Sequence, residues 1–379
     1  MESPPRTNEN VSTAELEIDK LFRAVVKLDG SDLHMKPDKP PFVRVTGALR
    51  PLNRPPVDDA EMQRLVDPLL TDRLRAMLEA TGGADFAYTL TIDDTTWRFR
   101  LSVFRQMGRL GLVARKVNAK VPDFASLHLP PTLEKLCHHQ QGMVLVAGPT
   151  GSGKSTTIAS MLDFINHQHR RHIITLEDPI EFVFTEDKCL VTQREIGLDV
   201  VDFEHGMKQV VREDPDVMLV GEMRDRTSFM TAMQAAETGH LVFATIHASS
   251  AATTIGRILD LFPSDMHHAV RMSIAANMRG IVAQKLLPSI VDGVSRVPAV
   301  ELMLYTPVVQ KLVIEAQDDK LASAIRIGAG EGMQDFTMSL KGLVETELVD
   351  RQVAIEAAPN ADELKMALKG ISIMAGGIL

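Results

Sequence analysis

Residues 148–155 read GPTGSGKS and match the pattern GxxxxGK(S/T) of a phosphate-binding loop. The apolar run MVLVA at residues 143–147 comes directly before this loop, and residues 156–166 follow it with helical spacing. A strand, a glycine-rich loop and a helix in this order aim several backbone N–H groups at one point, where the phosphates of a nucleotide can sit. We therefore predict an α/β domain built around this loop. The alternative is an ordinary glycine-rich turn.

The residues of this loop differ in what they offer a nucleotide. Lys154 is expected to reach the β- and γ-phosphates, and the hydroxyl of Ser155 is expected to ligate Mg²⁺. The predicted nucleotide contacts are Pro149, Thr150, Gly151, Ser152, Gly153, Lys154, Ser155 and Thr156.

The composition is that of a globular protein. Of the 379 residues, 45% are hydrophobic and 24% are charged, and the net charge is −9. Such an acidic chain lacks the overall positive charge of a nucleic-acid-binding protein, so we expect no nucleic-acid partner. No apolar run is long enough to span a bilayer, and residues 1–21 contain no stretch of the signal-peptide type. We therefore expect a cytoplasmic protein without direct membrane insertion.

Cysteine and histidine residues give no sign of a metal centre. Cys137 and Cys189 do not form a CxxC pair, and the histidines show no metal-ligand spacing with carboxylates. We predict neither a disulfide framework nor a transition-metal site.

Changes of pattern along the chain divide it into five predicted parts. Residues 1–13 are polar and predicted to be disordered, and residues 14–120 mix helical spacing with alternating strands, as in a small α+β domain. Three prolines mark residues 121–131 as an interdomain linker. Residues 132–290 form the predicted α/β core, and residues 291–379 read as a mainly helical C-terminal region with a late strand at 300–304.

Four continuous apolar runs define the core. They are separated by stretches with helical spacing or turn residues, and they cover residues 143–147, 173–176, 217–220 and 241–246. Runs of this kind are typical of strands covered on both faces, so they predict a parallel sheet flanked by helices.

Carboxylates follow two of these predicted strands. Glu177, Asp178 and Glu181 come after the run at 173–176, and Glu222 follows the run at 217–220 with Gly221 between. Ligands of open α/β sheets bind where the strands end, and ATP hydrolysis needs carboxylates for Mg²⁺ and for water. We predict Glu177, Glu181 and Glu222 as catalytic, with Glu222 also organising Mg²⁺. The alternative is that these residues cap helices.

Two histidines lie at opposite ends of the run at 241–246. His247 follows it, at the same predicted edge as the phosphate loop, where it can sense a phosphate or the attacking water. His240 precedes it and faces the other edge. The alternative for both is a histidine satisfied by backbone groups in a turn.

Basic residues gather in the strands that close the first domain. They are Arg98, Arg100, Arg105, Arg109, Arg115 and Lys116. Most suit a solvated strand face, while two or three can supply phosphate-neutralising arginines from another domain or subunit. Because the phosphate loop has no arginine close by in the sequence, we expect an external one.

Five stretches in this order resemble a known family. GPTGSGKST, TLEDPIEFVF, VTQREIGLD, REDPDVMLVGEMRD and AAETGHLVFATIHASSA are similar to the secretion ATPases of type II secretion and type IV pili, most closely the pilus-retraction (twitching motility) ATPases. The resemblance covers residues 31–370. It implies a RecA-like P-loop ATPase core, a PAS-like N-terminal domain and a helical C-terminal region.

The resemblance also implies roles for single residues. Lys154 and Ser155 match the Walker A pair, and Glu222 matches the Walker B glutamate. Glu177, Asp178 and Glu181 match the family's "Asp box". His240 and His247 match its "His box", which adds His240 to the predicted catalytic residues. Arg100 and Arg115 match N-terminal arginines that contact nucleotide phosphates. The departure at Gln106-Met107-Gly108-Arg109 argues against Arg109 in this role.

The family implies a homohexamer that uses ATP, with Mg²⁺, to drive rotation between its domains and so power pilus retraction at an inner-membrane platform protein. It would then be peripheral to the inner membrane at the pilus base. The alternatives are an accessory paralogue of the retraction ATPase, which would act with another pilus ATPase, a secretion ATPase or a hexameric nucleic-acid translocase. Residues 331–336 are similar to both the main and the accessory retraction ATPase, so they leave these two readings open.

Overall fold

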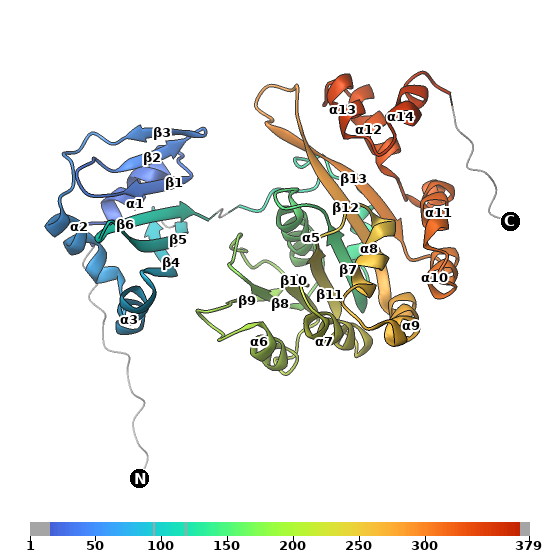
Figure 1. Cartoon of the computed structure of the whole chain (residues 1–379), viewed down its shortest axis with the longest axis horizontal. Helices are drawn as coiled ribbons and strands as arrows, with labels where there is room; N and C mark the ends of the chain where they lie inside the picture. The colour runs from blue at the N-terminus through green and yellow to red at the C-terminus, as the bar shows by residue number, and fades with distance from the viewer. Residues whose placement is uncertain (1–15, 94, 118–119, 372–379) are drawn as a thin grey trace, which may run out of the picture. The chain divides into compact units, whose positions relative to one another are not determined.

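The computed structural model describes residues 16–93, 95–117 and 120–371 (Figure 1). The chain divides between residues 119 and 120 into two compact units, each with its own hydrophobic core. The first 15 residues, which include the segment predicted to be disordered, lie outside the described part.

The first unit is an α+β structure around a six-stranded antiparallel sheet. The order of its strands is β3-β2-β1-β6-β5-β4. Their bounds are β1 (Asp32–Met35), β2 (Phe42–Val45), β3 (Ala48–Pro51), β4 (Gly83–Ile92), β5 (Thr95–Gln106) and β6 (Arg109–Lys116). The alternating strands predicted within residues 14–120 are found as β4, β5 and β6, which pair along their whole length.

Helices α1 (Asp19–Lys27), α2 (Asp59–Val66) and α3 (Asp72–Thr81), with the 3-10 helix η1 (Asp67–Leu69), cover one face of this sheet. Alternation along β5 buries Phe99, Leu101 and Val103 against them. The ring of Phe22 on α1 stacks on that of Phe99 with centroids 4.8 Å apart. The opposite face of β5 carries Arg98 and Arg100, so the pattern that builds this core also places these arginines on the face turned away from the helices.

The second unit is built on a seven-stranded sheet in the order β13-β12-β7-β11-β10-β8-β9. All strands are parallel except β13, which runs antiparallel to β12. Their bounds are β7 (Gly142–Ala147), β8 (His172–Glu177), β9 (Leu190–Glu195), β10 (Val217–Glu222), β11 (Leu241–Ile246), β12 (Met278–Pro288) and β13 (Arg296–Leu304). The four predicted apolar runs became the central strands β7, β8, β10 and β11, which confirms the RecA-like α/β core.

Helices cover both faces of this sheet. Alternate residues of β7 separate the two layers, because Met143 and Leu145 join one buried cluster while Val144 and Val146 join the other. The helices are α4 (Leu133–Cys137), α5 (Lys154–Gln168), α6 (Phe203–Val210), α7 (Arg226–Glu237), α8 (Ala251–Leu259), α9 (His267–Asn277), α10 (Pro307–Ile314), α11 (Leu321–Ile327), α12 (Phe336–Glu345), α13 (Arg351–Ala357) and α14 (Ala361–Ala367), with 3-10 turns η2 (Ser264–Met266), η3 (Asp318–Lys320) and η4 (Gly328–Glu331). The mainly helical C-terminal region is thereby confirmed.

The predicted boundary between residues 290 and 291 is wrong. It falls in the loop of the β12–β13 hairpin, whose strands pair from Gly280 with Leu304 to Pro288 with Arg296. Strand β13 therefore completes the sheet of the core, and the helical region begins at α10. Strand β12 was not among the strands predicted for the core.

The predicted linker at residues 121–131 is attached to the second unit over most of its length. Phe124 and Leu129 are buried in the cluster that also holds residues of α5, and the Phe124 ring stacks on Phe164 with centroids 5.6 Å apart. Burying these apolar side chains stabilises the attached form, so this segment is packed and not a free tether.

Over the residues with an assigned conformation, no helix is both long enough and apolar enough to cross a membrane.

Candidate active site

The phosphate loop follows β7 and leads into α5 through three glycines with positive φ. These are Gly148 (φ 152°), Gly151 (φ 78°) and Gly153 (φ 87°), and helix α5 begins at the next residue, Lys154. A Cβ atom on Gly148 would lie only 2.5 Å from the carbonyl oxygen of Gln284. The loop therefore needs glycine at this position both for its backbone angle and for its close approach to β12.

Lys154 lies at the first residue of α5, with its side chain turned back along the loop. Its Nζ donates to the carbonyl oxygens of Gly148 at 2.9 Å and Pro149 at 3.0 Å. Burial lowers the pKa of Lys154, while the negative charges of Glu222 and Glu181 oppose this shift. These two carboxylates favour the charged form of the ammonium group, which is the form that attracts phosphate, and they offset the effect of burial only in part.

Glu222 ends β10 and is aimed by an irregularity in the strand. The pairing of β10 with β11 shifts register between Val220 and Glu222, at Gly221. An extra residue in a strand redirects the side chain that follows it. The Glu222 carboxylate lies 2.8 Å from His247 Nε2 and accepts a hydrogen bond from Arg224 Nη2 at 2.9 Å. Burial raises the pKa of Glu222, but the Arg224 hydrogen bond and nearby positive charges outweigh it and lower the pKa below its usual value.

Glu177 ends β8 and has the opposite electrostatic character. Its Oε1 accepts hydrogen bonds from the Thr175 hydroxyl at 2.7 Å and from Gln193 Nε2 at 3.3 Å. Burial outweighs these hydrogen bonds and raises the pKa of Glu177 to about 7. A carboxylate that titrates near neutral pH is suited to take a proton from water, whereas Glu222 stays ionised and suits a cation.

These groups face one cleft of about 560 Å³ in the second unit. Parallel strands bring their carboxyl ends to the same edge of the sheet, and this edge carries the phosphate loop, Glu177, Glu222 and His247. Of the predicted site residues, the cleft is lined by Thr150, Gly151, Gly153, Lys154, Ser155, Thr156, Glu177, Glu181, Glu222 and His247.

Three predicted residues of the second unit do not line the cleft. Pro149 is exposed beside it, and Ser152 is buried beneath the loop. His240 precedes β11, at the opposite edge of the sheet, and its Nδ1 contacts the Ala235 carbonyl oxygen at 2.8 Å. Within this chain, His240 is thus a histidine satisfied by backbone in a turn, and the structure does not bring it to the cleft.

The two predicted arginines of the first unit lie side by side on the face of its sheet that is turned away from its helices. Arg100 on β5 is directly opposite Arg115 on β6, and both are exposed. Arg115 Nε donates to Asp32 Oδ1 at 2.8 Å. Burial raises the pKa of Asp32, but the hydrogen bond from Arg115 helps to keep it lowered, so Asp32 remains an anchor for the guanidinium. Two adjacent guanidinium groups form a surface that attracts anions.

Arg109 belongs to a different arrangement. Its Nε and Nη2 donate to the two carboxylate oxygens of Asp59, both at 2.8 Å, and its Nη1 contacts Asp38. The hydrogen bond from Arg109 lowers the pKa of Asp38. Three N–H donors of Arg109 are thus occupied by two carboxylates of the first unit, which gives this arginine a structural role. This agrees with the sequence argument against a contact between Arg109 and phosphate.

The structure adds an arginine that the sequence reasoning missed. Arg224 lines the cleft with its side chain 71% exposed, so the core itself brings an arginine to the cleft although none is close to the phosphate loop in the sequence. Arg224 follows Glu222 by two residues, and Asp225 next to it caps α7 by accepting from the Ser228 backbone N–H at 2.8 Å. The signal was present in the sequence as a basic residue beside a predicted metal-organising carboxylate.

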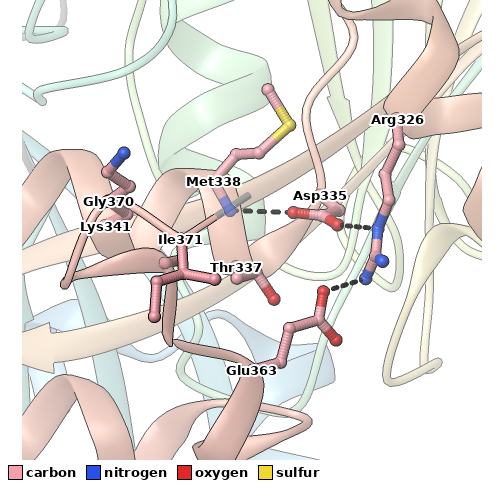
Figure 2. A pocket seen from close by; sticks show the side chains of 9 residues that line it. Arg326, Asp335, Thr337, Met338, Lys341, Glu363, Gly370 and Ile371 are labelled. Atoms are coloured by element: carbon pink, nitrogen blue, oxygen red, sulfur yellow. Dashed lines mark hydrogen bonds and ion pairs between the residues drawn. The ribbon is translucent and has the colours of Figure 1, made fainter. Parts of the chain in front are cut away.

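A second, smaller cavity of about 240 Å³ lies among the C-terminal helices (Figure 2). Arg326 dominates it, with Nε donating to Asp335 at 2.6 Å and Nη2 within 2.5 Å of Glu363. Figure 2 shows the guanidinium between these two carboxylates. The two carboxylates balance the charge of the Arg326 guanidinium. These ion pairs connect α11, α12 and α14, so this cavity has a structural role. Among the residues whose placement is described, no cluster of three His, Cys, Asp or Glu side chains has the geometry of a metal site.

Comparison with known proteins identifies relatives over nearly the whole chain. Residues 7–363 match the family model "Type II/IV secretion system protein". The chain is 40% identical to the type IV pilus retraction ATPase PilT of Pseudomonas aeruginosa, over 90% of this chain and 98% of that protein. It is 34% identical to the type IV pilus ATPase PilU of the same organism, over 93% and 92%. A crystal structure of the pilus retraction motor PilT with bound ADP superimposes with a TM-score of 0.84 at 39% identity, over 93% of this chain and 99% of that one.

Proposed function

The chain belongs to the type II/IV secretion system protein family, as a P-loop ATPase of its pilus retraction group, and from this premise we propose that it is an ATP-driven motor of type IV pilus retraction. The observation that carries the proposal is the cleft of the second unit. It combines a phosphate loop with Glu177 and Glu222, two carboxylates whose pKa values are shifted in opposite directions.

The residues of the cleft fit ATP and Mg²⁺. The hydroxyl of Ser155 and the ionised carboxylate of Glu222 are the oxygen ligands that Mg²⁺ prefers, and both line the cleft. Bound Mg²⁺ supplies positive charge against the phosphate oxygens. Lys154 and the backbone N–H groups at the start of α5 bind phosphate, Glu177 orients and deprotonates the attacking water, and Glu181 adds negative charge at the mouth of the cleft. His247 holds Glu222 in place through their 2.8 Å contact.

We further propose that the active assembly is a homohexamer in which Arg100 and Arg115 reach the phosphates bound by a neighbouring ATPase core. What supports this is their exposed, adjacent position on the sheet face turned away from the helices, together with the anchoring of Arg115 by Asp32. ATP turnover would then change the orientation of the two units, which drives rotation at the inner-membrane platform protein and withdraws pilin subunits. In this proposal the motor is cytoplasmic and peripheral to the inner membrane at the pilus base.

The accessory role is the second candidate, supported by the similarity to PilU. An accessory ATPase would act together with a paralogous pilus ATPase and would not retract pili alone. Nucleic acid has no part in either candidate, since the net charge of −9 disfavours a DNA- or RNA-binding channel.

The site is tested by ATPase assays on the purified full chain. Lys154→Ala and Glu222→Gln are expected to lower kcat at least 100-fold, whereas Glu347→Gln, at an exposed position outside the cleft, is expected to match wild type. Unchanged turnover in Lys154→Ala would show that the site is assigned wrongly. Stimulation of turnover by single-stranded DNA would favour a nucleic-acid translocase instead.

The biological role is tested by imaging pilus retraction in a strain lacking this gene. Loss of retraction that wild-type protein restores and Lys154→Ala does not would support the motor role. Normal retraction in the deletion strain contradicts that role. Such normal retraction would favour the accessory role.

A further inference from the structure

Strand β12 carries a buried amide beside the phosphate loop. Gln284 is 1% exposed, between the apolar residues Ile281–Ala283 and the half-buried Lys285. Taking an amide out of water without hydrogen bonds costs several kcal/mol, so the hydrogen-bond partners of Gln284 indicate its role. The last parallel pair between β12 and β7 joins Ala283 to Ala147, which places Gln284 next to Gly148 at the start of the loop.

Gln284 contacts the loop at its beginning and middle, and it also contacts the first turn of the helix that follows. Its backbone carbonyl oxygen packs where a Cβ of Gly148 would otherwise lie. Its Nε2 donates to the carbonyl oxygen of Ser152, and its Oε1 accepts from the hydroxyl of Thr157 at 2.8 Å in the first turn of α5. Ser152 and Thr157 are themselves buried. One side chain therefore ties the loop to the helix that it opens.

The hydrogen bond to Ser152 fixes the direction of a peptide group. In a trans peptide the carbonyl of one residue and the N–H of the next point in opposite directions. Because the Ser152 carbonyl points toward Gln284 in the interior, the N–H of Gly153 points away from the interior, toward the cleft that Gly153 lines. Gly153 adopts φ 87°, and a Cβ there would lie 3.0 Å from Gln284 Nε2, so the peptide has little room to turn over.

We propose that Gln284 is a positioning residue for the phosphate loop: its amide holds the Ser152–Gly153 peptide so that the Gly153 N–H donates to nucleotide phosphate. The proposal rests on the assignment of this loop as the nucleotide site. Gln284 touches no substrate and acts only through the loop. Its strand also pairs with β13, so the same residue lies where the loop meets the strand that leads to the C-terminal helices.

The test is ADP binding by calorimetry and ATP turnover, both on the full chain. Gln284→Met keeps the size of the side chain and removes both hydrogen bonds. We expect the Kd for ADP and the KM for ATP to rise about tenfold, which equals about 1.4 kcal/mol, with a smaller change in kcat. Thr157→Val is expected to weaken binding less, and Thr157→Ser to restore it, since serine keeps the hydroxyl.

Gln284→Glu gives a readout that a purely structural role would not move. An ionised carboxylate repels the Ser152 carbonyl, whereas a protonated one donates to it. Relative to wild type at each pH, the affinity of Gln284→Glu for ADP should therefore recover as the pH is lowered. Gln352→Met, at an exposed position on α13, is the matched control and should bind ADP like wild type.

The outcomes separate this inference from the assignment of the site. If Gln284→Met folds and binds ADP within twofold of wild type while Lys154→Ala binds poorly, the positioning role is refuted and the nucleotide site stands. If Lys154→Ala also binds like wild type, both fail. Should Gln284→Met not fold, Gln284→Glu decides, because wild-type ADP affinity at every pH in that variant overturns the proposal.

Discussion

Glu177 gives the sharpest quantitative prediction because its burial affects stability and activity in opposite ways. Its pKa is about 7 in the fold against an ordinary value of 4.5. Between these pH values the folded protein holds a proton that the unfolded chain has released, so stability falls as pH rises. The stabilisation of the protonated form is fully present below about pH 4.5 and is lost as pH rises through about 7.

The size of this effect follows from the same shift. The difference between 4.5 and about 7 corresponds to at most about 3 kcal/mol lost at pH 8. Glu177→Gln cannot ionise, and its amide oxygen can still accept from the Thr175 hydroxyl. The variant should therefore match wild type at pH 4.5 and exceed its thermal midpoint at pH 8, by roughly 2–4 °C per kcal/mol for a unit of this size.

Activity should change in the other direction. If Glu177 takes a proton from water, it must be ionised, so wild-type kcat/KM should rise with pH through an apparent pKa near 7. Glu177→Gln should lose that dependence together with at least 100-fold in kcat. Circular dichroism melts and ATPase rates between pH 5 and pH 8.5 measure both. Glu347→Gln, an exposed carboxyl, should follow wild type throughout.

Two results would refute this reasoning separately. A difference in thermal midpoint between Glu177→Gln and wild type that stays constant with pH would show that burial does not raise the pKa of Glu177. A variant that keeps wild-type turnover would show that Glu177 is not the base, whatever its pKa.

Three further predictions follow from single contacts. Arg224→Ala should change the free energy of unfolding by less than about 1 kcal/mol, because its ion pair with Glu222 is exposed. The same variant should lower kcat at least tenfold, and Arg224→Lys should not restore the wild-type kcat. Thermal melts measure the first effect and steady-state kinetics the second. His240→Ala should leave the ADP affinity of the chain unchanged, whereas His247→Ala should lower the rate of ATP turnover. An equal loss of ADP affinity and of turnover in the two variants would contradict the placement of His240 outside the cleft. Gly148→Ala should destabilise the chain by about 2 kcal/mol or more, because its Cβ would meet a backbone oxygen at 2.5 Å, and an unchanged thermal midpoint would show that the loop relaxes freely.

The sequence predicted the centre of the second unit better than its margins. The central strands are buried on both faces, so their apolar runs stand out against the helices. Strand β9, with the sequence LVTQRE, lies at the edge of the sheet and reads as polar. Strand β12, in which a glutamine and a lysine interrupt the apolar pattern, was not among the predicted strands. The positions of both polar residues are explained only by their tertiary contacts, which the local sequence pattern does not reveal.

Some residues of the candidate site could likewise be predicted from the sequence, and others could not. Glu177, Glu222 and His247 could be located from the sequence because strand ends of a parallel sheet share one edge. The bulge at Gly221, the Arg224 side chain in the cleft and the Gln284 amide beneath the loop could not, because each depends on how separate strands meet. The prolines of residues 121–131 mark a break in regular structure but do not tell that Phe124 and Leu129 pack on the second unit.

The antiparallel strand β13 has a consequence for how members of this family can diverge. It forms the outermost strand of the core sheet and leads directly into α10, so the C-terminal helices share a hydrophobic core with the ATPase strands. A region joined in this way cannot be exchanged between motors as a separate cassette, because removing it exposes β12 as a new sheet edge. Changes of partner or of task in this region must therefore arise by substitution on its surface, with the shared core kept intact.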